Sequence, residues 1–151
     1  MPEQNQFKIK LSQVTSPGSS NPSIPPTTEY CIVHEAADDS LSLALIIARA
    51  ADERKAANIE ILKVGGVSYL ADYFIIMTGF SKVQLRGISN AIQDQVYESL
   101  ARHPLRVEGL SDANWVLHDY GDAIAHIFMP QEREFYNLEA FWGHAERIQY
   151  Y

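Results

Sequence analysis

The stretch WVLHDYGDAIAHIF, residues 115–128, decides the fold, because two runs with a two-residue side-chain period flank Tyr120-Gly121. Such a period is typical of strands, and a glycine between two such runs favours a tight turn. We therefore predict a β-hairpin whose second strand runs from Asp122 to Met129 and ends at Pro130. Its even-numbered side chains are expected on one face of a sheet and its odd-numbered side chains on the other.

The rest of the chain shows both helical and extended patterns. Apolar residues at helical spacing predict one helix over about 39–58 and a second over about 81–103. Extended runs predict strands at residues 59–64, 72–79 and 106–109, and the nearly continuous apolar character of the second run predicts burial on both of its faces. Residues 131–151 are expected to form helical turns whose aromatic side chains cover a sheet face or a partner. The predicted fold class is therefore α/β (α+β), a single two-layer domain with a mixed β-sheet and flanking helices.

Composition divides the chain into two parts. The first part is rich in Pro, Ser and Thr, so we expect residues 1–38 to be a disordered N-terminal extension and 39–151 to be one folded domain. No apolar run reaches the roughly 18 residues of a membrane helix. Residues 1–38 match the pattern of a secretory or organellar targeting sequence poorly, so we do not expect them to be one. The single cysteine, Cys31, fits a reducing compartment. These features predict a cytoplasmic protein without membrane contact.

The formal net charge of −7 bears on the class of partner. A protein whose affinity comes from neutralising phosphates is more often basic. The acidic balance therefore favours a basic partner and predicts little or no direct RNA contact. It also helps to keep a chain soluble.

A serine near the predicted second helix resembles a catalytic or phosphate-binding residue. Ser81 and Gln84, in TGFSKVQ, instead have the spacing of a capping box, in which each side chain hydrogen-bonds the backbone of the first helical turn. Neither G-x-S-x-G nor a G-K-[ST] loop is present. We expect capping and not catalysis. Hydrolysis catalysed by Ser81 and a histidine is the alternative. It predicts that the protein has a hydrolytic activity and that Ser81→Ala abolishes this activity.

The hairpin itself carries two histidines and two aspartates. His126 is expected as a hydrogen-bonded neutral imidazole inside the sheet, and His118 lies in the first strand. Zinc needs three or four converging ligands, and no typical ligand spacing is present. Asp119 and Asp122 are separated by the turn, which suits the paired carboxylates of magnesium-dependent nucleotidyl transfer poorly. We predict no catalytic residue, metal or cofactor, with a nucleotide and magnesium titration as the test.

Four motifs are similar to those of a known family. They are LADYFIIMTGFSKVQ, VEG, WVLHDYGDAIAHIF and REFYNLEAFW, and they occur in the order and near the spacing of the ribosomal silencing factors, the Iojap or RsfS family. The resemblance covers about residues 41–142. It implies a nucleotidyltransferase-type fold without the catalytic residues. It also implies binding to ribosomal protein fourteen on the intersubunit face of the large subunit, which blocks small-subunit joining and represses translation under nutrient limitation. Large-subunit assembly and a nucleotide-binding, nucleotidyltransferase-like activity are the alternatives.

The resemblance implies partner-binding residues around the hairpin and the last helical turns. They are Trp115, Asp119, Tyr120, Asp122, Arg133, Tyr136 and Trp142. Trp115 and Tyr120 could give rigid contact area or belong to the core, and the aspartates could accept hydrogen bonds from a basic partner or only fix the turn. Asn58 and Lys63 depart from the acidic residues that relatives often carry there. The family resemblance also suggests a possible homodimer.

Overall fold

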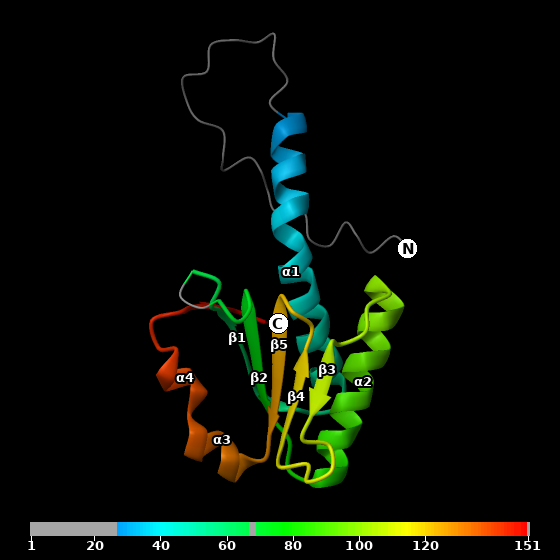
Figure 1. The fold of residues 1–151 in the computed structure, drawn as a ribbon, viewed down its shortest axis with the longest axis vertical. Coiled ribbons are helices and arrows are strands. Elements are labelled where there is room, and N and C mark those ends of the chain that lie inside the picture. Colours follow the sequence, from blue (N-terminus) through cyan, green and yellow to red (C-terminus); the bar gives the residue numbers. More distant parts are fainter. Residues whose placement is uncertain (1–26, 67–68, 151) are drawn as a thin grey trace.

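The computed structural model describes the backbone of residues 27–66 and 69–150, with side chains from Asp39 onward (Figure 1). Within these residues the elements are α1 (Thr27–Glu53), β1 (Ala57–Lys63), β2 (Tyr73–Thr78), α2 (Lys82–Leu100), β3 (Arg106–Glu108), β4 (Trp115–Asp119), β5 (Ala123–Phe128), α3 (Pro130–Tyr136), α4 (Leu138–Phe141) and β6 (Glu146–Ile148). No helix in these ranges is long and apolar enough to cross a membrane.

The strands form one mixed sheet in the order β3-β4-β5-β2-β1-β6. The predicted hairpin is confirmed, because β4 and β5 pair antiparallel with Trp115 opposite Phe128 and Asp119 opposite Ile124. Next to it, β5 pairs with β2 in parallel, and the other neighbouring strands are antiparallel. β2 is buried along its whole length, as the continuous apolar run predicted.

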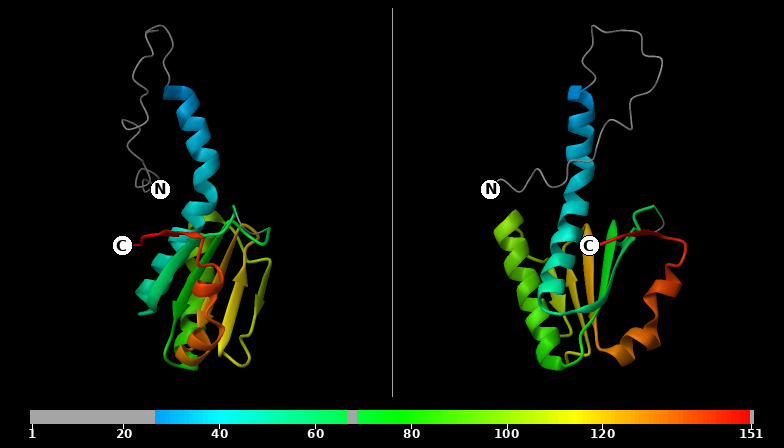
Figure 2. Two further views of the ribbon diagram at one scale, coloured as in Figure 1. Left: turned by 90° about the vertical axis from the view of Figure 1, so that its left-hand side faces the viewer. Right: turned by 180° about the vertical axis from the view of Figure 1, so that it is seen from behind.

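The two faces of the sheet are covered differently. Helices α1 and α2 lie side by side on one face, while α3 and α4 lie on the other (Figure 2). Ala123, Ala125 and Ile127 belong to the core beneath α1 and α2, whereas Ile124 and Phe128 belong to a separate cluster on the opposite face. The predicted alternation along β5 is thereby confirmed, and the expected α+β fold with flanking helices is present.

The start of α2 also agrees with the sequence. Ser81 is its N-cap, and the Ser81 hydroxyl accepts a hydrogen bond from the Gln84 amide at 3.0 Å. The Gln84 side-chain oxygen Oε1 accepts a hydrogen bond from the Phe80 amide at 2.8 Å, one residue before the N-cap amide that donates in a standard capping box. Ser81 is therefore used by the helix end, as expected.

Two boundaries and one strand differ from the predictions. Helix α1 begins at Thr27, so residues 27–38 are helical although they were assigned to the disordered extension, and it ends at Glu53 instead of near Asn58. The helix was not predicted over residues 27–38 because their apolar periodicity is weak. Residues 1–26 lie outside the described residues, and the division of the chain at 38/39 stays a prediction. The last segment was expected as helical turns throughout, but β6 adds a strand at the sheet edge beside β1.

Candidate partner-binding surface

The four predicted contact residues of the hairpin lie at its two opposite ends. Trp115 starts β4, whereas Asp119, Tyr120 and Asp122 surround the turn that joins β4 to β5. With a rise of about 3.3 Å per residue, the two groups are roughly 13 Å apart along the strand. The two groups therefore have different surroundings.

Trp115 is half-buried at the centre of an aromatic cluster. Its ring stacks on Phe128 at a centroid distance of 4.8 Å and contacts Tyr136 of α3 at 4.7 Å. The indole Nε1 donates a hydrogen bond to His126 Nδ1 at 3.2 Å. Trp115 therefore packs between strand β5 and helix α3, and its predicted role in partner binding stays a prediction.

The other predicted residues of α3 and α4 hold these short helices in place. The Arg133 guanidinium is mostly buried and donates to Thr78 Oγ1 at 2.8 Å and to Glu139 Oε2 at 2.6 Å. Trp142 lies edge-on to Phe74 with a centroid distance of 5.6 Å. Both side chains stabilise the packing against the sheet, and Arg133 has little charge left for a partner.

An exposed apolar surface covers this scaffold. Phe135 is 79% exposed, Tyr136 is 47% exposed and Phe141 is 71% exposed. We call these three residues the α3–α4 aromatic surface. Phe135 and Phe141 were expected to cover a sheet face or a partner but were not among the predicted contact residues. Leu138 and Trp142 pack inward against the sheet, and this packing leaves the rings of the α3–α4 aromatic surface exposed. The sequence alone did not show which aromatic residues of this segment would face inward.

At the turn end, Asp119 is engaged by the protein itself. Its Oδ1 accepts a hydrogen bond from the Gly121 amide at 2.8 Å, and its Oδ2 lies 3.3 Å from Arg106 Nε of the neighbouring strand β3. Gly121 has a φ of +93°, a conformation that glycine adopts readily. The side chain thus fixes the turn, which was one of the two roles considered for it.

Asp122 is neutralised more completely. Both carboxylate oxygens accept from the Arg102 guanidinium, at 2.8 and 3.1 Å, and Ser40 Oγ lies 3.1 Å from Oδ2. Burial alone would raise the pKa of Asp122, but the hydrogen bonds and charge of Arg102 outweigh burial and leave the pKa below its ordinary value. The carboxylate is therefore charged at neutral pH and already paired.

The structure places Tyr120, one of the predicted contact residues, inside the core. Its side chain is only 2% exposed and lies in the core beneath α1 and α2, so it has almost no surface to offer a partner. Burial raises the pKa of the phenol to about 12, against the opposing effect of Arg102. Tyrosine is amphipathic and common both in cores and at interfaces, and the sequence did not distinguish these settings.

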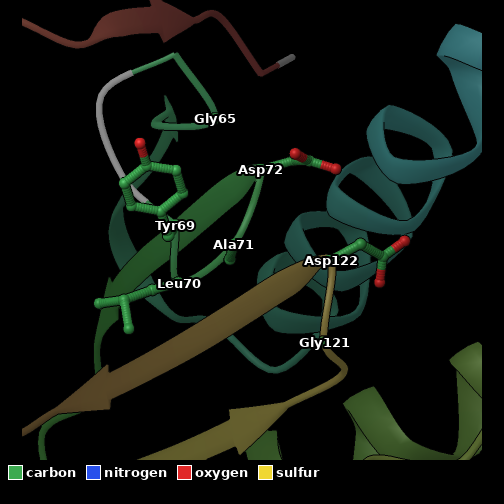
Figure 3. A pocket seen from close by; sticks show the side chains of 7 residues that line it. All are labelled: Gly65, Tyr69, Leu70, Ala71, Asp72, Gly121 and Asp122. Carbon is green, nitrogen blue, oxygen red and sulfur yellow. The ribbon is translucent and has the colours of Figure 1, made fainter.

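A hollow of about 430 Å³ lies beside the turn (Figure 3). Gly65, Leu70 and Ala71 contribute to its wall, and the carboxylates of Asp72 and Asp122 point from it toward α1. The Ser40 hydroxyl lies 3.1 Å from an oxygen of each carboxylate. These acids are thus held by groups of the protein, and no group of three or more potential metal-ligating side chains occurs in the part of the chain that the structure describes.

The two hairpin histidines are buried on opposite sides of the sheet. His118 Nε2 lies 2.7 Å from the Ser89 hydroxyl of α2, and His126 Nδ1 accepts the hydrogen bond from the Trp115 indole. Desolvation lowers the pKa of each imidazole to about 4, so both are neutral at pH 7. The expected hydrogen-bonded neutral His126 is confirmed.

Comparison with known proteins agrees with this architecture. A family described as "Ribosomal silencing factor during starvation" matches residues 37–150. The chain belongs to the ribosomal silencing factor family. Over 104 residues it is 41% identical to "Ribosomal silencing factor RsfS" of Bacillus subtilis, covering 69% of this chain and 87% of that one. It is 40% identical over 117 residues to "Protein Iojap, chloroplastic" of Zea mays, covering 76% of this chain and 50% of that protein.

Solved structures show the same fold. A crystal structure from Chromobacterium violaceum has a TM-score of 0.67 at 26% identity, covering 74% of this chain and 92% of that one. A second, from Bacillus halodurans, has a TM-score of 0.60 at 34% identity and covers 72% and 95%. Membership of the family supports a ribosome-associated role in regulating translation. The resemblance to nucleotidyltransferase-type folds stays a prediction.

Proposed function

We propose that this protein binds ribosomal protein fourteen on the intersubunit face of the large subunit and blocks joining of the small subunit, repressing translation when nutrients are limiting. The family assignment supports association with the ribosome, and the α3–α4 aromatic surface is the observation that carries the proposed contact. Exposed aromatic residues on a well-packed support are the usual centres of protein interfaces. The net charge of −7 supports docking on a basic protein.

The proposed contact is centred on Tyr136 and extends over Phe135 and Phe141. Trp115 supports Tyr136 from below, and Arg133 and Trp142 hold α3 and α4 against the sheet. Asp119 and Asp122 would contribute only through oxygen atoms left accessible by their internal bonds. Tyr120 is excluded from the proposed surface by its burial.

Sedimentation with isolated large subunits, isolated small subunits and joined ribosomes tests the proposal. We expect retention on free large subunits and a smaller fraction of joined ribosomes when small subunits are added afterwards. Retention without any effect on joining would favour the large-subunit assembly role. Absence of retention on large subunits would contradict the proposal, and saturable binding of nucleotide with magnesium would then support the enzymatic alternative. The cytoplasmic location also stays a prediction, since the maize relative is named as chloroplastic.

A single substitution tests the surface. Tyr136→Ala should weaken binding to isolated ribosomal protein fourteen by about 2 kcal/mol, roughly thirtyfold, if the ring fills a pocket on the partner. Tyr97→Ala is a matched control, because Tyr97 is 52% exposed on α2 and stacks only on His103 among the ring contacts of the described residues. Equal affinities of the two variants would show that the contact lies elsewhere.

A further inference from the structure

Positive charges are distributed unevenly over the described surface. Half of the described Lys and Arg side chains have a carboxylate partner: Lys63 with Glu146, Arg102 with Asp122, Arg106 with Asp119, Arg133 with Glu139 and Arg147 with Glu60. Within the described residues, five have no ion pair within 4.0 Å. Arg49 lies near Tyr150, and the other four, Arg54, Lys55, Lys82 and Arg86, gather around the first turns of α2.

Specific contacts bring these four residues together from two segments. The Gln84 side-chain amide donates to the carbonyls of Arg54 and Lys55, both at 3.1 Å, and so ties the end of α1 to α2. The Arg54 guanidinium lies over Gly87, with Nη1 3.8 Å from the position that a Cβ would occupy there. Lys82 and Arg86 are one helical turn apart on α2. We call Arg54, Lys55, Lys82 and Arg86 the α2 basic patch.

Hydrogen bonds orient two of these charges without neutralising them. Lys82 Nζ donates to the carbonyl of Asp112 at 2.7 Å, and Arg86 donates to the carbonyls of Leu110 and Ser111 at 3.2 and 3.0 Å. The nearby carboxylate of Glu53 accepts a hydrogen bond from the Gln95 side chain of α2 and forms no ion pair with these basic residues. All four basic side chains are exposed, so the patch keeps its positive charge facing solvent.

Apolar side chains lie among the charges. Phe80 is 60% exposed immediately before the Ser81 cap, and Val83 is 78% exposed in the first turn of α2. Basic side chains that bind phosphates and an aromatic ring on which a base can stack are the combination used by proteins that bind single-stranded nucleic acid. The four side chains and Phe80 thus match RNA better than they match an acidic protein segment, which needs no stacking surface.

We propose that the α2 basic patch binds RNA, through the phosphate backbone and a base stacked on Phe80. The inference rests on the ribosome association of the family, and it is independent of the proposed contact with ribosomal protein fourteen. It differs from the expectation of little RNA contact, because the net charge of −7 averages over acidic surfaces that lie elsewhere. The charge that a ligand meets is set by the surface within about a Debye length, roughly 8 Å at physiological ionic strength.

The patch is suitably placed to act together with the aromatic surface. Helix α2 directly follows β2, and α3 directly follows β5. These two strands are parallel neighbours, so both helices begin at the same end of the sheet, the lower end in Figure 1. A ribosomal surface that presents a protein and an adjacent RNA segment could therefore be contacted by both surfaces at once.

The test uses the full chain and two ligands measured separately: a short fluorescein-labelled single-stranded RNA and isolated ribosomal protein fourteen. We expect wild-type protein to bind the RNA with a log–log salt slope of about −3, from four contacts at about −0.7 each. Lys82→Gln with Arg86→Gln should halve this slope and weaken RNA binding about tenfold or more, with unchanged affinity for protein fourteen. Phe80→Ala should weaken RNA binding with little change in slope.

The control removes the same charge from a distant edge of the sheet. Lys63→Gln with Arg147→Gln changes β1 and β6, and RNA binding should stay close to wild type. Arg54→Gln with Lys55→Gln provides a second patch variant if the first fails to fold, as judged by circular dichroism. The proposal is overturned if wild type does not bind RNA, if both patch variants bind like the control, or if the patch binds phosphatidylserine vesicles and not RNA. Loss of protein-fourteen binding alone would contradict only the proposed function.

Discussion

The side chains at the two ends of the β4–β5 hairpin are engaged in different ways. At the turn end, Asp119 and Asp122 are bound by Arg106 and Arg102, and Tyr120 is inside the core. At the aromatic end, Trp115 is half-buried and supports Tyr136, which remains exposed. Internal pairing has left the turn end with little to offer a partner, whereas the aromatic end combines a rigid support with free apolar area. A dense motif can therefore contain one half whose polar groups are paired internally and one half that supports an exposed apolar surface.

The largest expected effect tests the structural role of the turn end. Tyr120→Ala should lower the free energy of unfolding by about 3–5 kcal/mol, because it empties a buried site of aromatic size. Tyr120→Phe should change it little, since the buried hydroxyl has no hydrogen-bond partner among the described residues. Urea denaturation measures both changes. If Tyr120→Ala leaves stability intact but weakens ribosome binding, Tyr120 belongs to the contact surface after all.

The buried histidines extend the comparison to both ends, because His126 bonds Trp115 and His118 lies near Tyr120 on the other face. Burial lowers the pKa of both imidazoles to about 4 in the folded protein. As the pH falls, these histidines therefore become protonated in the unfolded state before they do so in the folded state. Their stabilisation is complete above the unfolded pKa of about 6.5 and is lost as the pH falls toward 4. By about pH 5.5 the loss should be about 1.4 kcal/mol for each histidine.

Urea denaturation at neutral pH and near pH 5.5 checks this pH dependence. His118→Gln with His126→Gln should flatten it, and the same two changes at His103 and His144, which are exposed, serve as the control. If the pH dependence of the free energy of unfolding is unchanged in the variant with His118→Gln and His126→Gln, other groups cause it. The two single variants would separate the contributions of the two faces.

The aromatic end is tested by removing its support. Trp115→Ala should cost about 2 kcal/mol or more of ribosome binding and should also destabilise the fold, because the indole stacks on Phe128 and bonds His126. Tyr136→Ala, by contrast, should reduce binding with a smaller change in stability. Sedimentation and urea denaturation of both variants measure the two effects separately. A folded Trp115→Ala protein that binds like wild type would refute its contribution.

The smallest expected effect concerns the ion pair at the turn. Asp122→Asn should lower the free energy of unfolding by about 1 kcal/mol, a value reduced for solvent screening because the Arg102 and Asp122 side chains are 35% and 26% exposed. It should leave binding to ribosomal protein fourteen nearly unchanged. Calorimetric and affinity measurements on this variant would sharpen the contrast with Tyr136→Ala. A large loss of affinity would place the turn end in the interface.

Local patterns were sufficient for most elements. The two-residue period predicted the hairpin and its two faces, continuous apolar character predicted the burial of β2, and Ser81 predicted the cap of α2. The boundaries of α1 and the presence of β6 were missed. The α1 segment before residue 39 has little apolar periodicity, and β6 is a short strand whose existence depends on its pairing with β1.

The sequence by itself determined the family, the mixed sheet with flanking helices and the positions of the chemically notable side chains, because these depend on motifs and on periods of a few residues. Only the tertiary structure decided which of those side chains are free. Arg102 and Asp122 pair across twenty residues, Tyr120 turns inward, and Arg54 joins α2 through Gln84. Exposure and neutralisation are properties of neighbours in space, and contacts between distant segments leave no local pattern in the chain.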